Sequence, residues 1–236
     1  MRVENFFGHN VNVGSLLEEK HPCMDYFIKE EEPGYAEMKN FWELTKDRKN
    51  LLDVGCALGM YSLVFCNRAD KVAHSFDASH ETQLIIEQNI ALNSDKHITY
   101  HKMFLGDKDA ITPYNSDGFH AFAINGSDRV LMLRVDSFCS LFEFIPDTIK
   151  IDTEGYEYNI LMGGKDVLME YRPLMFIELH PKFCGMYGTK INQVVDVAEV
   201  LGYTIKDVNG SKFVNEQLYQ SEENSIKTIW YPNECV

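Results

Sequence analysis

Two glycines and an aspartate follow apolar runs of the sequence at a spacing that suits a nucleoside ligand. Gly55 comes directly after the apolar residues 51–54, and Gly59 lies four residues further on, where a helical pattern begins. A glycine after a strand permits positive φ and lets a ligand approach without meeting a Cβ, and helix N-terminal amides favour an anionic group. Asp77 ends the next apolar run, where a carboxylate can accept hydrogen bonds from both ribose hydroxyls. These features predict a nucleoside-containing cofactor.

The residues between the glycines distinguish two such cofactors. A dinucleotide fold requires G-x-G-x-x-G to hold a pyrophosphate, whereas here Ala57 occupies the position of the second glycine. Asp53 would lie poorly beside a pyrophosphate, but it suits the ammonium and sulfonium charges of S-adenosylmethionine. We therefore expect S-adenosylmethionine, and a nicotinamide oxidoreductase is the weakest alternative.

Acids and a histidine end two later apolar runs. Asp152 and Glu154 follow residues 148–151, and Glu178 and His180 end the run at residues 174–179. A hydroxyl acceptor of a methyl group needs a base, and the ordinary pKa of histidine suits proton transfer. We predict His180 as the catalytic base, with Asp152 and Glu154 orienting the acceptor or serving as the base instead. The alternative is a strand-end histidine bonded to a backbone carbonyl.

Two further interpretations concern the same region. If Asp152, Glu154, Glu178 and His180 converge, their oxygen atoms would suit magnesium or calcium, but we assign no metal ligand from the sequence. The helical position of Glu157 predicts a structural role on the solvated side of its helix.

Strands and helices alternate around these residues. Helices are predicted at residues 35–46, 61–66, 81–92, 156–162 and 192–201, and strands at residues 50–54, 71–76, 97–105, 148–152, 174–179, 204–208 and 226–231. Loops and short strands are expected at residues 107–128. Such alternation implies a mostly parallel sheet covered on both faces, with ligands at the carboxyl ends of the strands.

Composition limits the partners. The 236 residues carry 22 basic and 36 acidic side chains, for a net charge of −14, so a nucleic acid partner is not expected. The six cysteines form no C-x-x-C pair, and no apolar run is long enough to span a bilayer. We expect reduced thiols, no membrane partner and a cytoplasmic location, while the oligomeric state stays open.

Two stretches of sequence resemble a known family. "LLDVGCALGMYSL" is similar to the glycine loop of class I S-adenosylmethionine-dependent methyltransferases. "IKIDTEGYEYNILMGG" followed by "PLMFIELHP" resembles the signature of FkbM-type methyltransferases, and the resemblance covers residues 49–182. It implies a Rossmann-like fold and methylation of hydroxyl groups on sugars and other small metabolites.

The resemblance also implies roles for individual residues. Asp53, Gly55 and Gly59 would hold the methionine end of the cofactor, Asp77 with Ala78 the ribose, and Leu105, Gly106 and Asp107 the adenine, while Asp152 and Glu154 would face the transferred methyl group. The sequence departs from the family at Phe76-Asp77-Ala78, where Phe-Glu-Pro is usual, and at Cys56-Ala57-Leu58.

Together, the strand pattern and this resemblance imply an α/β, Rossmann-like class I methyltransferase with a mostly parallel seven-stranded sheet, helices on both faces and an antiparallel last strand. Residues 1–47 would form an N-terminal lead with a lid helix that carries Tyr35 and Glu37, and residues 48–236 the methyltransferase domain. An N-methyltransferase acting on bases would carry an Asn/Asp-Pro-Pro-aromatic string, which Asp152-Thr153-Glu154-Gly155 lacks. A catalytically silent binding module remains the alternative. Acceptor specificity is expected in residues 1–47, 113–129 and 183–190.

Overall fold

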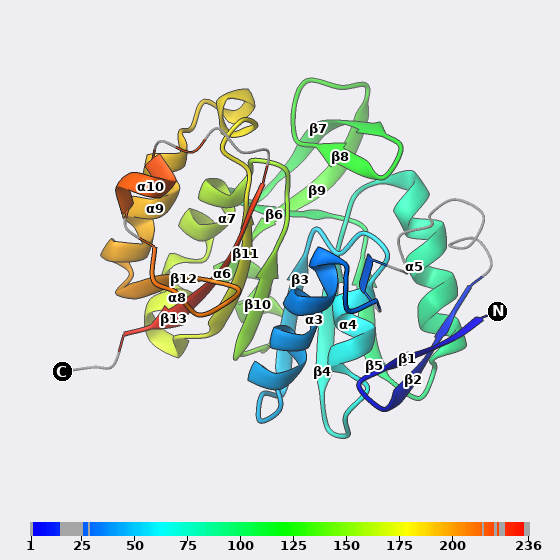
Figure 1. Cartoon of the computed structure of the whole chain (residues 1–236). Helices are drawn as coiled ribbons and strands as arrows, with labels where there is room; N and C mark the ends of the chain where they lie inside the picture. The colour runs from blue at the N-terminus through cyan, green and yellow to red at the C-terminus, as the bar shows by residue number, and fades with distance from the viewer. Residues whose placement is uncertain are drawn as a thin grey trace.

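One large sheet organises the computed structural model (Figure 1), which describes residues 2–14, 26–27, 29–213, 215–219, 221 and 225–233. Its seven strands lie in the order β12 (Tyr203–Asp207), β13 (Ile226–Pro232), β11 (Leu174–Leu179), β10 (Thr148–Ile151), β3 (Asn50–Val54), β4 (Val72–Phe76) and β5 (His97–His101). Neighbouring strands run parallel, except that β13 is antiparallel to both β11 and β12. The predicted sheet with an antiparallel last strand is confirmed.

The three central strands are buried on both faces because they are apolar along almost their whole length. Leu51 and Leu52 are adjacent in β3, yet they belong to two different hydrophobic cores. Two charged residues interrupt this apolar centre, Asp53 in β3 and Lys150 in β10, and they are direct partners in the register of the two strands. The apolar runs therefore build the sheet, and the charges within them need a separate explanation.

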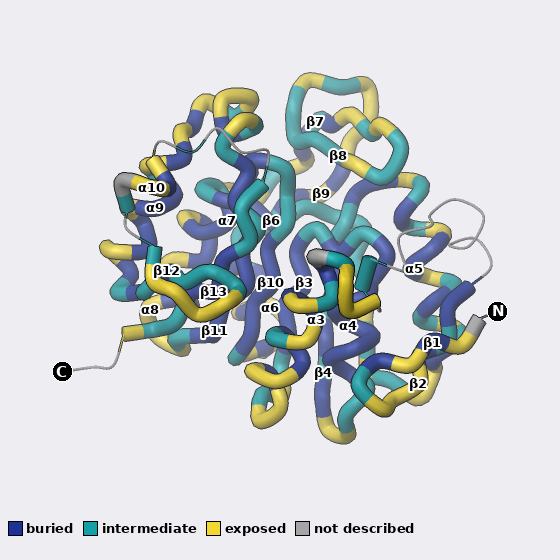
Figure 2. Tube along the Cα trace, in the orientation of Figure 1, coloured by how far each residue is buried: buried dark blue, intermediate teal, exposed yellow. Residues whose placement is uncertain are grey.

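Helices cover both faces of the sheet, as predicted. One core packs α3 (Pro33–Leu44), α4 (Met60–Phe65) and α5 (His80–Leu92) against it. The other core holds α6 (Val135–Leu141), α7 (Glu157–Gly163), α8 (Lys165–Tyr171) and α9 (Ile191–Val200). Figure 2 shows the buried sheet strands between these two layers. Among the described residues, no helix combines the length and the apolar character that crossing a bilayer requires.

A second, four-stranded sheet stands over the carboxyl ends of the central strands (Figure 1). Its order is β6 (Phe104–Gly106), β9 (Asp128–Arg134), β7 (Ala110–Asp117) and β8 (His120–Phe122). The single strand predicted at residues 97–105 is therefore wrong, because the chain leaves the large sheet after His101 and joins the small sheet at Phe104. A turn in which the Met103 N–H bonds to the His101 carbonyl, at 2.9 Å, separates the two strands.

The N-terminal residues pack onto the same body. A hairpin of β1 (Arg2–Phe6) and β2 (His9–Val13) leads to Gly14, whose N–H donates to Asn89 Oδ1 of α5 at 3.0 Å. In α3, the Phe41 ring lies 5.0 Å from both Tyr61 and Phe176. The chain division at residue 47 and the lid role of α3 stay predictions.

Candidate active site

Gly55 makes the sharp turn after β3. Its φ is +74°, and a Cβ there would lie 1.8 Å from the backbone oxygen of Asp152, which follows β10. The glycine is thus required by the close approach of two chain segments as well as by φ. Gly59, with φ +75°, is the N-cap of α4, and a Cβ there would lie 2.9 Å from the Ile86 side chain.

Asp77 ties the first two loops together. Its Oδ2 accepts the Ala57 N–H at 3.0 Å, and its Oδ1 accepts the Ser79 N–H at 2.9 Å. Burial raises the pKa of Asp77, and these backbone hydrogen bonds oppose the rise. Ala57 has a φ of 44°, a left-handed conformation that the bond to Asp77 helps to hold. The carboxylate therefore fixes the shape of the glycine loop.

A cavity of about 320 Å³ opens where these loops meet the small sheet. Of the residues predicted for the site, Gly55, Asp77, Ala78, Asp152 and Glu154 line it. Leu105 and Met103 form another part of its wall. The remaining predicted site residues do not line it; these are Asp53, Gly59, Gly106, Asp107 and His180.

Asp53 lies beneath the cavity and is 1% exposed. Its Oδ2 accepts the Ser62 hydroxyl at 2.7 Å, and its Oδ1 is buried without a partner among the described residues. Burial raises the pKa of Asp53 to about 6, against the hydrogen bond from Ser62. Asp53 therefore does not line the cavity, and its expected contact with the methionine end of the cofactor stays a prediction.

Gly106 and Asp107 have packing roles in the structure. A Cβ at Gly106 would lie 2.8 Å from Met132 Sδ and 2.9 Å from the Tyr156 ring. Asp107 is exposed and accepts the Tyr156 hydroxyl at 3.1 Å. Of the three residues expected beside the adenine, Leu105 lines the cavity and Gly106 and Asp107 do not, and the place of the adenine stays a prediction.

A buried lysine and a partly exposed one accompany the acids near the cavity. Lys150, 1% exposed, lies 3.6 Å from Asp152 Oδ2 and 3.8 Å from Glu37 Oε1. Burial lowers the pKa of Lys150, but the charges of the nearby acids outweigh burial, and the net result is a raised pKa. Lys227 pairs with Glu37 and lies 3.6 Å from Glu178 Oε2. A lysine inside the apolar run of β10 is a signal that could have been noticed, because a buried ammonium needs an acid partner.

His180 is held by a carboxylate. Its Nδ1 lies 2.9 Å from Glu157 Oε1, which also accepts the Gly155 N–H at 3.0 Å. The alternative of a backbone carbonyl partner is therefore wrong for this nitrogen, and so is the solvated position predicted for Glu157, which is 0% exposed. Burial lowers the pKa of His180, but the hydrogen bond and charge of Glu157, with Asp152 and Glu154, raise it to about 9.

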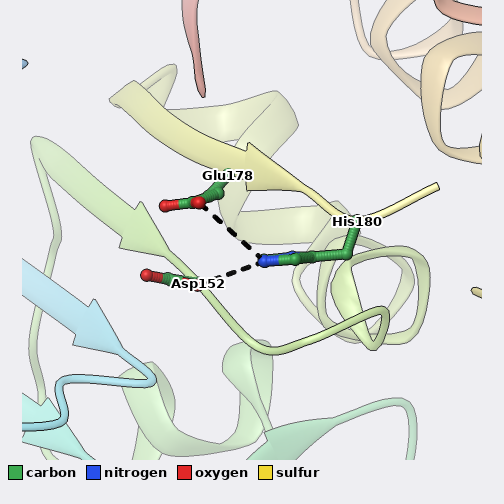
Figure 3. Close-up of side chains that lie close together, drawn as sticks. All are labelled: Asp152, Glu178 and His180. Carbon is green, nitrogen blue, oxygen red and sulfur yellow. Dashed lines mark ion pairs between the residues drawn. The ribbon is translucent and has the colours of Figure 1, made fainter. Parts of the chain in front are cut away.

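Three of the predicted residues converge from neighbouring strand ends. Asp152, Glu178 and His180 each offer one atom within 4.8 Å of the others (Figure 3). His180 Nε2 lies 3.7 Å from Asp152 Oδ1 and 4.0 Å from Glu178 Oε1.

Glu154 joins this group from the cavity wall. Its φ of 52° is left-handed, its Oε2 lies 3.6 Å from His180 Nε2, and its Oε1 lies 3.5 Å from Nδ1 of His120 in β8. Burial raises the pKa of Glu154, against the charge of His180.

The outer wall is aromatic. Within residues 113–129, Phe119 and His120 line the cavity, whereas Tyr114 is 2% exposed and packs with Ala78 and Val130. Further lining residues that the sequence did not assign to the site are Tyr26, Phe27, Tyr61, Lys150, Tyr156 and Tyr187. Periodicity could not identify them, because their segments meet only in the folded chain.

Comparison with protein families agrees with this geometry. Residues 53–205 match the Methyltransferase FkbM domain, a match that spans more than half of the 236 residues. The chain belongs to the FkbM methyltransferase family. S-adenosylmethionine is the methyl donor of these class I methyltransferases, so the predicted cofactor is confirmed for the family. No functionally curated protein matches the sequence.

Solved methyltransferase structures resemble this chain to different degrees. Methyltransferase FkbM from Methylobacillus flagellatus KT has a TM-score of 0.54 at 15% identity, over 78% of this chain and 44% of that one. This chain therefore spans less than half the length of that protein. A precorrin-6y C5,15-methyltransferase from Geobacter metallireducens GS-15 gives 0.49 at 12% identity, over 87% and 92% of the two chains. An rRNA methylase from Streptococcus thermophilus gives 0.49 at 9% identity, over 87% and 99%.

Proposed function

We propose that this chain transfers the methyl group of S-adenosylmethionine to a hydroxyl oxygen of a sugar, a glycan or another small metabolite. The observation that carries the proposal is that one cavity joins the glycine turn and Asp77 to Asp152 and Glu154. The first pair suits a nucleoside and the second pair suits a hydroxyl acceptor. Family membership supports S-adenosylmethionine as the methyl donor. The two acids support a hydroxyl oxygen as the acceptor.

The cofactor would lie along the loops that follow β3 and β4. Asp77 would accept hydrogen bonds from the ribose, and Leu105 and Met103 would contact the adenine. The sharp turn at Gly55 would leave room for the methionine part. This arrangement directs the sulfonium methyl group toward the carboxyl end of β10, where Asp152 and Glu154 lie.

Transfer is an in-line displacement. The acceptor oxygen forms a bond to the methyl carbon while the carbon–sulfur bond breaks, and that bond's electron pair stays on sulfur to give S-adenosylhomocysteine. The enzyme mainly has to orient the two reactants and to take up the hydroxyl proton.

Glu154 is the base in this proposal. Its carboxylate lines the cavity, and His120 lies 3.5 Å from one of its oxygens. Asp152, also in the wall, would orient the acceptor. The expected base, His180, is 3% exposed and lies outside the cavity wall, so it would act through Asp152 and Glu154 as a positioning residue.

The surroundings favour a small and neutral acceptor. Tyr26, Phe27 and Phe119 offer flat apolar surfaces of the kind that pack against sugar rings. The net charge of −14 disfavours a phosphate backbone. The four described cysteines are free and buried, which supports a reducing, cytoplasmic location.

An acceptor screen tests the proposal. The chain is incubated with S-adenosylmethionine and a panel of sugars and hydroxylated metabolites, and S-adenosylhomocysteine and methylated product are followed by mass spectrometry. With a productive acceptor, Glu154→Gln should lower turnover by about 100-fold and leave cofactor affinity unchanged, while the exposed-site control Asp95→Asn keeps full turnover. Cofactor binding without transfer to any acceptor would favour the silent binding module instead.

A further inference from the structure

The hydrogen bond to Glu157 directs the free lone pair of His180. Because the Glu157 carboxylate accepts, Nδ1 keeps its hydrogen, and Nε2 is the nitrogen that can bind a metal ion, with release of the proton that the raised pKa of the ring would otherwise keep there. The side chain of His180 is only 4% exposed. Among the described residues, Nε2 makes no hydrogen bond, and it faces carboxylate oxygens of Glu154, Asp152 and Glu178 at 3.6, 3.7 and 4.0 Å. A histidine whose second nitrogen is fixed by a carboxylate is a recurring arrangement at metal sites.

The facing carboxylates are oriented in the same way. Asp152 directs Oδ1 toward Nε2, while its Oδ2 lies 3.6 Å from Lys150. Glu178 directs Oε1 toward Nε2, while its Oε2 lies 3.6 Å from Lys227. One oxygen of each acid thus lies near a lysine. Figure 3 shows the ion pairs that join both acids to His180.

The separations fit a small cation. Two ligand atoms that are each about 2.1 Å from a metal lie about 3–4 Å apart. The distances from Nε2 to Asp152 and Glu178 are 3.7 and 4.0 Å, and all three atoms lie within 4.8 Å of one another, so an inward movement of the side chains completes the set.

Charge also favours a cation here. Five carboxylates surround the site, from Glu37, Asp152, Glu154, Glu157 and Glu178. Among the described residues, the basic groups paired with them are fewer, namely Lys150, the partly exposed Lys227, His180 and His120. Closely spaced acids in excess, two of them buried and three partly exposed, are stabilised by a positive ion.

We infer that Asp152, Glu178 and His180 bind one divalent metal ion beside the methyl-transfer cavity. Two carboxylate oxygens and one imidazole nitrogen suit Mg²⁺ and Mn²⁺, and the nitrogen favours Mn²⁺ of the two. Because Asp152 also lines the cavity, open positions of the ion would face the acceptor. The ion would bind the acceptor oxygen and ease loss of its proton, a role that rests on the proposed function, whereas metal binding does not.

Mn²⁺ binding tests the inference directly. The full chain is stripped with EDTA, dialysed and titrated with MnCl₂, and free Mn²⁺ is followed by electron paramagnetic resonance. We expect one ion per chain with a Kd below about 100 μM. Mg²⁺ should compete, and saturating Mn²⁺ should raise the Tm.

Variants locate the bound ion. Glu178→Gln and His180→Gln should each weaken Mn²⁺ binding at least about 10-fold, and Glu157→Gln about 10-fold through the orientation of His180. Asp95→Asn, a matched loss of one charge at an exposed position, should leave the Kd unchanged. If His180→Gln fails to fold, as judged by circular dichroism, Glu178→Gln decides the question. The inference is overturned if the folded wild-type chain shows no saturable binding up to about 1 mM, or if the Kd is the same in Glu178→Gln. Methyl transfer is scored separately, so its failure leaves the metal result interpretable.

Discussion

At the scale of single residues, Gly55 carries the turn on which the cavity depends. Two effects oppose any other side chain there, the φ of +74° and a Cβ placed 1.8 Å from the Asp152 backbone oxygen. Gly210 isolates the first effect, because its φ is +86° but no atom lies within 4 Å of its Cβ position.

The comparison gives a prediction about stability. Gly210→Ala should lower the free energy of unfolding by about 1 kcal/mol, the cost of the left-handed conformation alone. Gly55→Ala should lower it by at least about 3 kcal/mol, because the ends of β3 and β10 must also separate. Urea unfolding measures both values, and equal losses would show that the close approach to Asp152 costs nothing.

At the scale of elements, β10 is an apolar strand that carries a buried lysine, and α3 brings Glu37 to it. Removing either charge takes one of two partners from the other, since Lys150 keeps Asp152 and Glu37 keeps Lys227, so Lys150→Met and Glu37→Gln should each cost about 1–3 kcal/mol of unfolding free energy. The double variant should cost less than the sum by at least about 1 kcal/mol. Denaturant unfolding of all four proteins gives this coupling.

An exposed ion pair provides the control for the comparison of single and double variants at Lys150 and Glu37. Arg134 and Asp109 lie 3.3 Å apart, with side chains 43% and 42% exposed. Their coupling should be below about 1 kcal/mol. A coupling at Lys150 and Glu37 as small as this one would contradict a strong buried pair.

Strands β4 and β5 share a pair of histidines that should make stability depend on pH. Nδ1 of His74 and Nε2 of His101 are 2.8 Å apart. Burial, and then the charge of His74, lower the pKa of His101 to about 4, below the ordinary value of 6.5. Between pH 4 and 6.5, His101 is therefore protonated in the unfolded chain and neutral in the folded chain. The stabilisation is complete above pH 6.5 and is lost as the pH falls toward 4.

His101→Gln should remove this dependence. Between pH 6.5 and 4, the wild type should lose about 1–2 kcal/mol more stability than the variant, a figure reduced for the partial exposure of the ring. Urea unfolding across this pH range measures the difference. Parallel curves for the two proteins would assign the acid sensitivity to other groups.

At the scale of the whole molecule, local patterns predicted the large sheet well. The apolar runs at residues 50–54 and 174–179 coincide with β3 and β11, because buried parallel strands are continuous hydrophobic segments. The alternation of strands and helices predicted a parallel sheet, in which the loops after the strands meet at one edge. Gly55, Asp77 and Asp152 lie in such loops, and all three line one cavity.

Other features depended on contacts between distant segments. The hairpin of β1 and β2, strand β9 and helices α6 and α8 were not predicted. Glu157 follows the helical pattern, yet its side chain turns back to His180, 23 residues away, which periodicity cannot show. Asp53 has the expected type and spacing, but its side chain accepts the hydroxyl of Ser62 in α4 and does not line the cavity, which periodicity cannot show.

Binding of S-adenosylmethionine to the cavity at Asp77 is the most direct test of the whole account. Isothermal titration of the folded chain should give micromolar affinity for S-adenosylmethionine and S-adenosylhomocysteine, and none for NAD. Asp77→Ala should weaken both sulfur ligands by at least about 30-fold, since it removes about 2 kcal/mol of ribose and loop hydrogen bonding, while Asp95→Ala should bind like the wild type. Equal affinity in Asp77→Ala, or no binding of either sulfur ligand by the folded wild-type chain, would contradict the assignment of this cavity.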